Sequence, residues 1–329
     1  MCSIATGFFI ATACGGAKPW TQIELVGRYT LLGDVAEGKD LSGIACISDR
    51  FGLLGADEAR QVQVIEISRQ AKTLRVVETI TLARSGPEID IEAIAAEGDC
   101  YYIIGSHGVA KVTGKHQENR YSIFRLRVDP GTGVPRDLST GGSRVPASLD
   151  AASLAGAIRM DPVLREYFGK PLQRKGVNIE GLAARAGRLY VGFRSPNLDG
   201  EAFVMEVRAD SIFQGGSRLD YTLHRLKLGK GLGIREMVAA KSGFLIMAGN
   251  AGSEPSEEYA VSEDYQEGRA FSLFRWDGKG SAVHSIGILP KTAGQAEAMM
   301  ILEEKTDEMT VLVLFDGPNG GRPSVYRIQ

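Results

Sequence analysis

Glu180-Gly181-Leu182-Ala183 is one of five short stretches in which a polar residue is followed by three small or apolar residues. The other four are Ser42-Gly43-Ile44-Ala45, Glu92-Ala93-Ile94-Ala95, Glu236-Met237-Val238-Ala239 and Glu297-Ala298-Met299-Met300. Each copy is followed by a turn and then by two further apolar or alternating runs, which is the pattern of half-buried antiparallel strands. Repeats of this size and composition are typical of β-propeller blades.

A fourth strand completes three of the repeats, over residues 74–81, 221–228 and 282–289. The fifth repeat has none before Gln329, whereas a strand-like run over residues 23–31 precedes the first repeat. We expect this N-terminal strand to complete the last blade and close the ring, because closure protects the sheet edges. The sequence therefore predicts an all-β fold, with a single five-bladed β-propeller domain over residues 18–329.

The longest spacing between copies, from Glu92 to Glu180, leaves two interpretations open. Apolar residues recur at roughly helical spacing over residues 148–175, which predicts a helical insertion in the second blade. A sixth blade within the same spacing is the alternative.

The charge balance and the apolar pattern exclude several classes of partner. The chain has 329 residues, with 38 Lys and Arg against 40 Asp and Glu, a formal net charge of -2 and no cluster of basic residues. Nucleic-acid binding needs a basic footprint that displaces counterions from phosphates, so we expect no nucleic-acid partner. No apolar run approaches the roughly 18 residues of a spanning helix, and no glycine-rich stretch has the context of a phosphate loop. We therefore expect no transmembrane segment and no nucleotide or organic cofactor.

Residues 1–17 resemble a degenerate secretory signal. They contain an apolar stretch over residues 4–13 and small residues at a cleavage-like site, Ala11 and Ala13, but no basic residue. We expect a periplasmic or secreted protein if this segment is a signal, and a cytoplasmic protein if it is not. Outside the segment, Cys46 and Cys100 are too few and too far apart for a zinc site. They form either one disulfide or, as we favour, two small buried side chains.

Polar residues occur where the repeats should meet the central channel. In a propeller the first strand of each blade lines the channel, and hairpin pairing places its start beside the end of the second strand. The polar residues predicted to gather at this mouth are Asp57, Glu58, Glu92, His107, Glu180, Arg194, Arg235, Glu236, Asn250, Glu297 and Asp316. This convergence is the strongest functional signal in the sequence.

The carboxylates of this group suggest a cation. Like charges near one axis raise one another's pKa unless a positive charge compensates them, and calcium takes about six to eight oxygen ligands. We predict that a calcium ion is held by some of the residues Glu92, Glu180, Glu236, Glu297 and Asp316. The alternative is architectural, because a glutamate at one place in four repeats can bond backbone N–H groups of the adjacent blade.

The residues that differ between repeats are better candidates for chemistry. His107 is the candidate general base, because its side chain titrates near neutral pH. Arg194 is the candidate clamp for an anion through its planar donor fork. The alternatives are a structural His107 and an Arg194 that pairs with a nearby glutamate. The candidate ligand-binding residues are Asp57, Glu58, Arg235 and Asn250.

Several motifs resemble a known bacterial family. They are Asp40-Leu41-Ser42-Gly43-Ile44-Ala45-Cys46, Gly105-Ser106-His107-Gly108, Asn178-Ile179-Glu180-Gly181-Leu182, Leu198-Asp199-Gly200-Glu201-Ala202-Phe203 and Leu314-Phe315-Asp316-Gly317. Together they resemble the domain of unknown function 3616 (DUF3616), over nearly the whole chain from Asp40 onward. The family is similar to propellers with esterase-like phytase domains, many of them exported. This resemblance implies calcium and phosphate-ester cleavage by analogy, and it assigns no catalytic residue.

Two functions follow from these observations. The first is a calcium-dependent hydrolase of an ester or phosphoester, in which His107 is the base and Arg194 stabilises the developing anion. The second is a non-catalytic propeller that binds a small ligand or a partner protein on the same face. Propellers serve both purposes, so the fold alone does not choose between them.

Overall fold

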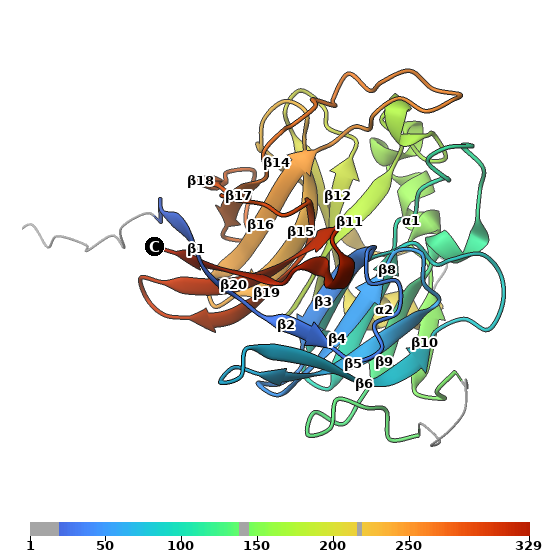
Figure 1. Ribbon diagram of the computed structural model, residues 1–329. Helices are drawn as coiled ribbons and strands as arrows, with labels where there is room; N and C mark the ends of the chain where they lie inside the picture. Colours follow the sequence, from blue (N-terminus) through green and yellow to red (C-terminus); the bar gives the residue numbers. More distant parts are fainter. Residues whose placement is uncertain (1–19, 138–144, 216–218) are drawn as a thin grey trace, which may run out of the picture.

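Five sheets surround one axis in the computed structural model, which describes residues 20–137, 145–215 and 219–329 (Figure 1). Four of the sheets have four strands and one has five. The predicted five-bladed β-propeller is confirmed, and the described residues form no sixth blade. The predicted signal segment lies outside the described residues, so export stays a prediction.

Each blade consists of an inner, a second, a third and an outer strand. The inner strands are β3 (Leu41–Cys46), β7 (Ile91–Glu97), β11 (Asn178–Arg185), β15 (Leu232–Ala240) and β19 (Gln295–Glu304). The second strands are β4 (Phe51–Ala56), β8 (Cys100–Gly105), β12 (Arg188–Ser195), β16 (Gly243–Asn250) and β20 (Met309–Asp316). The third strands are β5 (Gln61–Ser68), β9 (Ile123–Arg127), β13 (Ala202–Arg208), β17 (Ser272–Trp276) and β21 (Ser324–Ile328). The outer strands are β6 (Thr73–Thr81), β10 (Leu149–Ala152), β14 (Tyr221–Leu226), β18 (His284–Ile288) and β1 (Ile23–Arg28).

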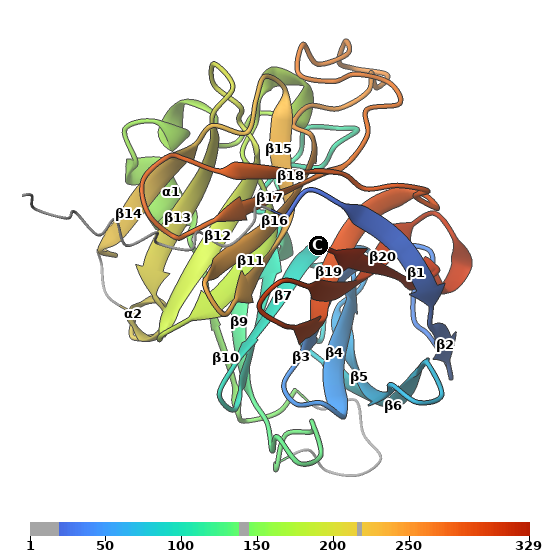
Figure 2. The same cartoon turned by 90° about the vertical axis from the view of Figure 1, so that its left-hand side faces the viewer.

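The N-terminal strand closes the ring, as the sequence predicts. β1 pairs antiparallel with β21 and is the outer strand of the fifth blade (Figure 2). The predicted run over residues 23–31 is divided in two, because β2 (Thr30–Leu32) leaves this blade and pairs parallel with β6 of the first. One short segment therefore holds the first and last blades together.

The helical insertion in the second blade is shorter than predicted. Its first residues, Leu149–Ala152, pair with β9 as the outer strand β10, because the blade needs a fourth strand to cover its third. The helices begin after this strand, with α1 (Ala155–Met160) and the 3₁₀ turns Leu164–Glu166 and Leu172–Arg174. The remaining helical elements are α2 (Ala209–Phe213) and the 3₁₀ turns Glu118–Tyr121 and Asn319–Gly321.

The core consists of five apolar clusters, one between each pair of adjacent blades. Small residues follow the polar residue of the repeat because the next blade packs against them. A Cβ atom on Gly43 would lie 2.8 Å from Ile94 of the second blade, and one on Gly181 would lie 2.8 Å from Ile234 of the fourth. Within the described residues Cys46 and Cys100 are free, and no helix is long and apolar enough to span a membrane.

Ring closure by β1 can be tested with Leu25→Asp. Leu25 is partly buried against the cluster between the fourth and fifth blades, so a charge there should cost roughly 1.5–3 kcal/mol of unfolding free energy. We expect a lower urea midpoint for this variant. Its neighbour Glu24 is exposed, and Glu24→Gln should leave the midpoint unchanged. Equal midpoints for Leu25→Asp and the wild type would contradict the closure.

Candidate functional site

Every inner strand carries a β-bulge near its start. In each case the pairing of the inner strand with the second strand skips one polar residue. The five skipped residues, which we name the bulge ring, are Ser42, Glu92, Glu180, Arg235 and Glu297. A bulge removes its residue from the ladder and redirects the side chain. All five residues line one cavity, so the bulges gather one polar side chain from each blade at the channel mouth.

The fourth blade contributes Arg235 to the ring, whereas the sequence repeat assigns this place to Glu236. The alignment is wrong by one residue here, because the ladder pairs Glu236 and skips Arg235. Glu236 is fully buried and does not line the cavity. Its Oε1 accepts backbone N–H bonds from Met237 at 2.7 Å and from Leu182 at 3.5 Å, and Met299 also donates to its carboxyl. The architectural alternative therefore describes Glu236, which joins the inner strands of three blades.

The cavity at the mouth has a volume of about 320 Å³ and a mainly polar lining. Eight of the predicted site residues line it: Asp57, Glu92, Glu180, Arg194, Arg235, Asn250, Glu297 and Asp316. Glu58, His107 and Glu236 do not. The later residues of the inner strands line a second cavity of about 150 Å³, which is apolar. The channel is therefore polar at one end and apolar at the other.

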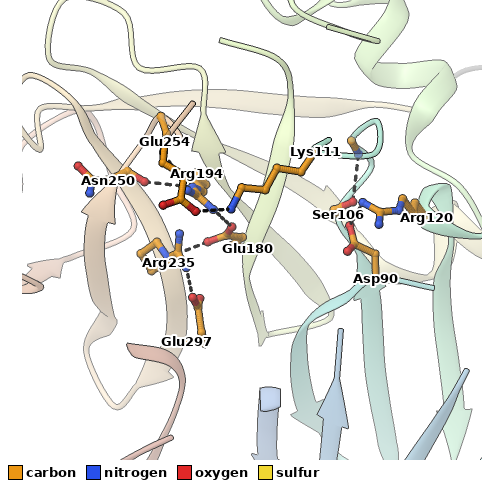
Figure 3. Close-up of polar contacts among 12 residues, drawn as sticks. Asp90, Ser106, Lys111, Arg120, Glu180, Arg194, Arg235, Asn250, Glu254 and Glu297 are labelled. Atoms are coloured by element: carbon orange, nitrogen blue, oxygen red, sulfur yellow. Dashed lines mark hydrogen bonds and ion pairs between the residues drawn. The ribbon is translucent and has the colours of Figure 1, made fainter. Parts of the chain in front are cut away.

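Two arginines and two glutamates form a buried network at the mouth (Figure 3). Glu180 accepts a hydrogen bond from Arg194 Nη1 at 2.8 Å, and its other oxygen lies 2.9 Å from Arg235 Nε. Arg235 also pairs with Glu297. Arg194 donates to two backbone carbonyls of the loop after β16, at 3.0 and 2.8 Å. The charges of both ring glutamates in this network are thus compensated within the protein.

Glu92 is the one ring carboxylate with neither a hydrogen bond nor an ion pair among the described residues. Burial raises its pKa well above the usual value, and the charge of Glu180 adds to this rise. Burial, followed by the charge of Asp90, raises the pKa of Asp57 to about 8. Burial also raises the pKa of Asp316. We name Asp57, Glu92 and Asp316 the acidic wall, because they line one cavity and no cation pairs with them.

A second ion-pair group lies beside this wall. Arg120 donates to Asp90 and to Glu88, each at 2.8 Å, and Ser106 also hydrogen-bonds Asp90. Figure 3 shows this group apart from the network of Arg194 and Glu180. Arg120 is therefore hydrogen-bonded to acids outside the wall, and it acts on Glu92 through its charge alone.

His107 is buried away from the cavity. Its Nδ1 donates to the carbonyl of Gly105 at 2.9 Å, and its Nε2 accepts the backbone N–H of Leu154 at 3.1 Å. Burial lowers the pKa of His107 to about 4. Both ring nitrogens are bonded to backbone, so His107 fastens the helical insertion to β8. The role of general base predicted for it does not fit this position.

Three loops surround the mouth. The loop after β16 and the helical insertion lie on the same side of the ring in both ribbon views (Figures 1 and 2). Lys111, from the loop after β8, pairs with Glu254 at 3.3 Å, and Gln173 of the insertion donates to the carbonyl of Glu254. Lys175 pairs with Glu263 at 2.6 Å. The acidic stretch after β16 is therefore anchored by basic residues of the neighbouring loops.

A family model described as "Protein of unknown function (DUF3616)" matches residues 40–326. The chain belongs to the DUF3616 family. The resemblance predicted from the sequence is confirmed to this extent, and the relation to phytase-like propellers stays a prediction. No curated protein sequence matches this DUF3616 protein.

Three solved structures illustrate what this DUF3616 protein is similar to, each at low sequence identity. A glutaminyl cyclase from Myxococcus xanthus is 11% identical, with 95% of this chain and 98% of that chain covered and a TM-score of 0.48. An exo-β-1,3-galactanase from Phanerochaete chrysosporium is 9% identical, with 93% and 64% covered and a TM-score of 0.47. An α-L-arabinofuranosidase from Podospora anserina is 10% identical, with 95% and 96% covered and a TM-score of 0.44. None of these similarities carries an argument about function.

The sequence pattern did not reveal two cavity residues of this DUF3616 protein. Arg120 ends a long loop without any repeat, so nothing in the sequence placed it beside Asp90. Ser253 lines the cavity at 1% exposure, and its hydroxyl has no hydrogen-bond partner among the described residues. The one signal for Ser253 in the sequence is its position next to the acidic residues Glu254, Glu257 and Glu258. Of the predicted ligand-binding residues, Asn250 lines the cavity but fixes its own loop by two hydrogen bonds to Gln266.

Two ring glutamates should differ in their effect on stability. Glu180→Gln leaves the buried Arg235 and Arg194 short of a counter-charge, and breaking such a pair costs about 3–5 kcal/mol. Glu92→Gln removes a carboxyl that nothing pairs with, so we expect no loss or a small gain. Urea unfolding of both variants at pH 8 measures the difference. If Glu180→Gln and Glu92→Gln lowered the unfolding free energy equally, the contrast between a paired Glu180 and an unpaired Glu92 would be contradicted.

The buried His107 should contribute to acid sensitivity. Its folded pKa of about 4 lies below the value of about 6.5 in an unfolded chain, so the unfolded state binds more protons between these values. Its contribution to stability is therefore lost as the pH falls from about 6.5 towards 4. We expect His107→Asn to lower the melting temperature at pH 7.5. Between pH 7.5 and 5, the melting temperature of this variant should fall less than that of the wild type. The same change at the exposed His284 should not alter this slope.

Proposed function

We propose that this protein is a small-molecule-binding propeller whose ligand occupies the cavity at the channel mouth and contacts Glu92. One observation carries the proposal: in the described part of the chain, four of the five ring residues have hydrogen-bond or ion-pair partners, and Glu92 has none. Ser42 donates to the carbonyl of Ile91, and the other three form the arginine network. A partly buried carboxyl that faces a cavity without a partner is typical of a ligand contact.

The predicted calcium-dependent hydrolase has less support. Two of the five predicted calcium ligands, Glu180 and Glu297, pair with arginines, and Glu236 lies outside the cavity. In the described part of the chain, one group of three carboxylates has oxygens within 4.8 Å of one another. It consists of Glu37, Asp40 and Glu58, of which the first and last are exposed. The predicted set does not fit a single calcium ion, and His107 is not placed to act as the base.

The cavity also limits the kind of ligand. A volume of about 320 Å³ is at the lower end of ligand pockets, which suits a compact molecule. Its lining includes acids, arginines and amides but few apolar side chains, so the ligand is polar. The loop after β8, the helical insertion and the loop after β16 border the cavity, because Lys111, Leu172 and Glu254 belong to its lining.

The test is a thermal-shift screen followed by titration calorimetry. The screen covers sugars, amino acids, amines, phosphoesters and dicarboxylates, and each hit is titrated into the wild type and into Glu92→Gln. A hydrogen bond to a charged group contributes about 1.5–3 kcal/mol, so we expect roughly a 10- to 100-fold weaker Kd for the variant.

Glu24→Gln is the matched control, because it removes the same charge from an exposed position on β1. It should bind every hit as the wild type does. A hit that binds Glu92→Gln and the wild type equally well would contradict the proposal, as would the absence of binding by every class.

A further inference from the structure

We infer that the ligand of this cavity is an organic cation, with a guanidinium or amine group that contacts the acidic wall of Asp57, Glu92 and Asp316. The inference rests on the proposed function and specifies the chemistry of its ligand. It is drawn from the pairing of charges around the cavity and from the buried acceptors that lack a donor.

Three of the arginines that line the cavity already form ion pairs with other acids. Arg120 is bound to Glu88 and Asp90, and Arg194 to Glu180 and two backbone carbonyls. Arg235 is bound to Glu180 and Glu297, which together raise its pKa although burial opposes its charge. None of these arginines forms an ion pair with Asp57, Glu92 or Asp316 in the described structure. The charge that remains open to a ligand on this side of the cavity is therefore negative.

Buried acceptors near the wall point to a ligand with several N–H groups. Asn178 belongs to β11, the inner strand next to that of Glu92, and its buried Oδ1 accepts no hydrogen bond among the described residues. The hydroxyl of Ser253, at 1% exposure, lines the same cavity and has no partner there. A buried polar atom without a partner is costly to the fold. A guanidinium has five N–H donors in a planar fork and can serve a carboxylate and such acceptors together.

The spacing of the wall favours an organic cation over a bare metal ion. No three oxygens from its described carboxylates lie within 4.8 Å of one another, as metal ligands would. An organic cation spreads its donors over a larger volume. Lys170 and Arg269 also line the cavity without an ion pair, so a ligand that carries an additional anionic group is compatible with the same site.

Cation binding should release protons. Glu92 is faced by Asp90, which precedes its own strand, and by Asp57, Glu180 and Glu297 of other blades. The guanidinium groups of Arg120 and Arg235 also face it. The acids among these groups, together with burial, raise its pKa, and a bound cation opposes that rise. The free site is therefore more protonated than the occupied site. Affinity should increase with pH, by up to about tenfold per pH unit while one proton is released.

The experiment uses a matched pair of probes, butylguanidinium and its neutral counterpart butylurea. Calorimetry at pH 6.5 and 8.5, in two buffers of different ionisation enthalpy, gives the affinity and the number of protons released. We expect butylguanidinium to bind at least about tenfold more tightly at pH 8.5, with proton release, and butylurea to bind at least about 100-fold more weakly. Asp57→Asn and Glu92→Gln should reduce both the affinity and the proton release, whereas Glu24→Gln should not.

Other outcomes separate the two proposals. Tight binding of butylurea or of neutral sugars, with no preference for cations, would overturn the cation inference and leave the ligand-binding function standing. Binding of calcium chloride with no response to butylguanidinium or butylammonium would show a metal site and overturn it too. If no probe of any class binds the folded wild type, the proposed function fails and the inference fails with it.

Discussion

The free edges of five inner strands face one axis, and the structure of the channel depends on how each edge is satisfied. Buried backbone groups need partners, and no further strand can be added at the axis. Glu236 supplies acceptors to the backbone of three inner strands, and Ser42 bonds the carbonyl of Ile91 in the next blade. The bulge at the start of each inner strand then turns one further side chain into the mouth. The residues that satisfy the inner-strand edges and the residues that line the cavity are thus neighbours within the same sequence repeat.

The charges of the ring are better explained by function than by stability. Replacing a buried ion-pair network by well-packed apolar residues is often neutral or stabilising, so such a network is weak evidence of a stabilising role. Arg235 compensates Glu180 and Glu297, and Arg194 compensates Glu180 a second time. Glu92 forms no ion pair with any residue that the structure describes, although the guanidinium groups of Arg120 and Arg235 face it. Glu92 therefore differs from the other four ring residues, each of which has a partner. Such a difference between blades suits a ligand site, because a ligand seldom has the fivefold symmetry of the ring.

Much of this structure could be predicted from the sequence, because apolar runs, turns and a repeated polar residue are local signals. The inner and second strands, the closing strand β1 and eight of the residues that line the cavity followed from them. The place of Arg235 did not, because the repeat pattern selects Glu236, the last polar residue before Met237-Val238-Ala239, and only the hydrogen-bond ladder shows that Arg235 is the skipped residue. His107 could not be placed either, since its partner Leu154 lies far along the chain. Contacts between residues that lie far apart in the chain produce no repeating pattern in the sequence.

An unoccupied acidic wall must be stable enough for the protein to fold, and protonation provides this stability. Burial raises the pKa of Asp57 to about 8 and raises that of Glu92 well above its usual value, which favours the protonated carboxyls when no cation is bound. A proton costs the fold no space and leaves the carboxyl able to accept a hydrogen bond. A cation that displaces such a proton would form an ion pair with the carboxylate it contacts. The same burial that makes an unpaired carboxylate unfavourable therefore makes the site responsive to a positively charged ligand.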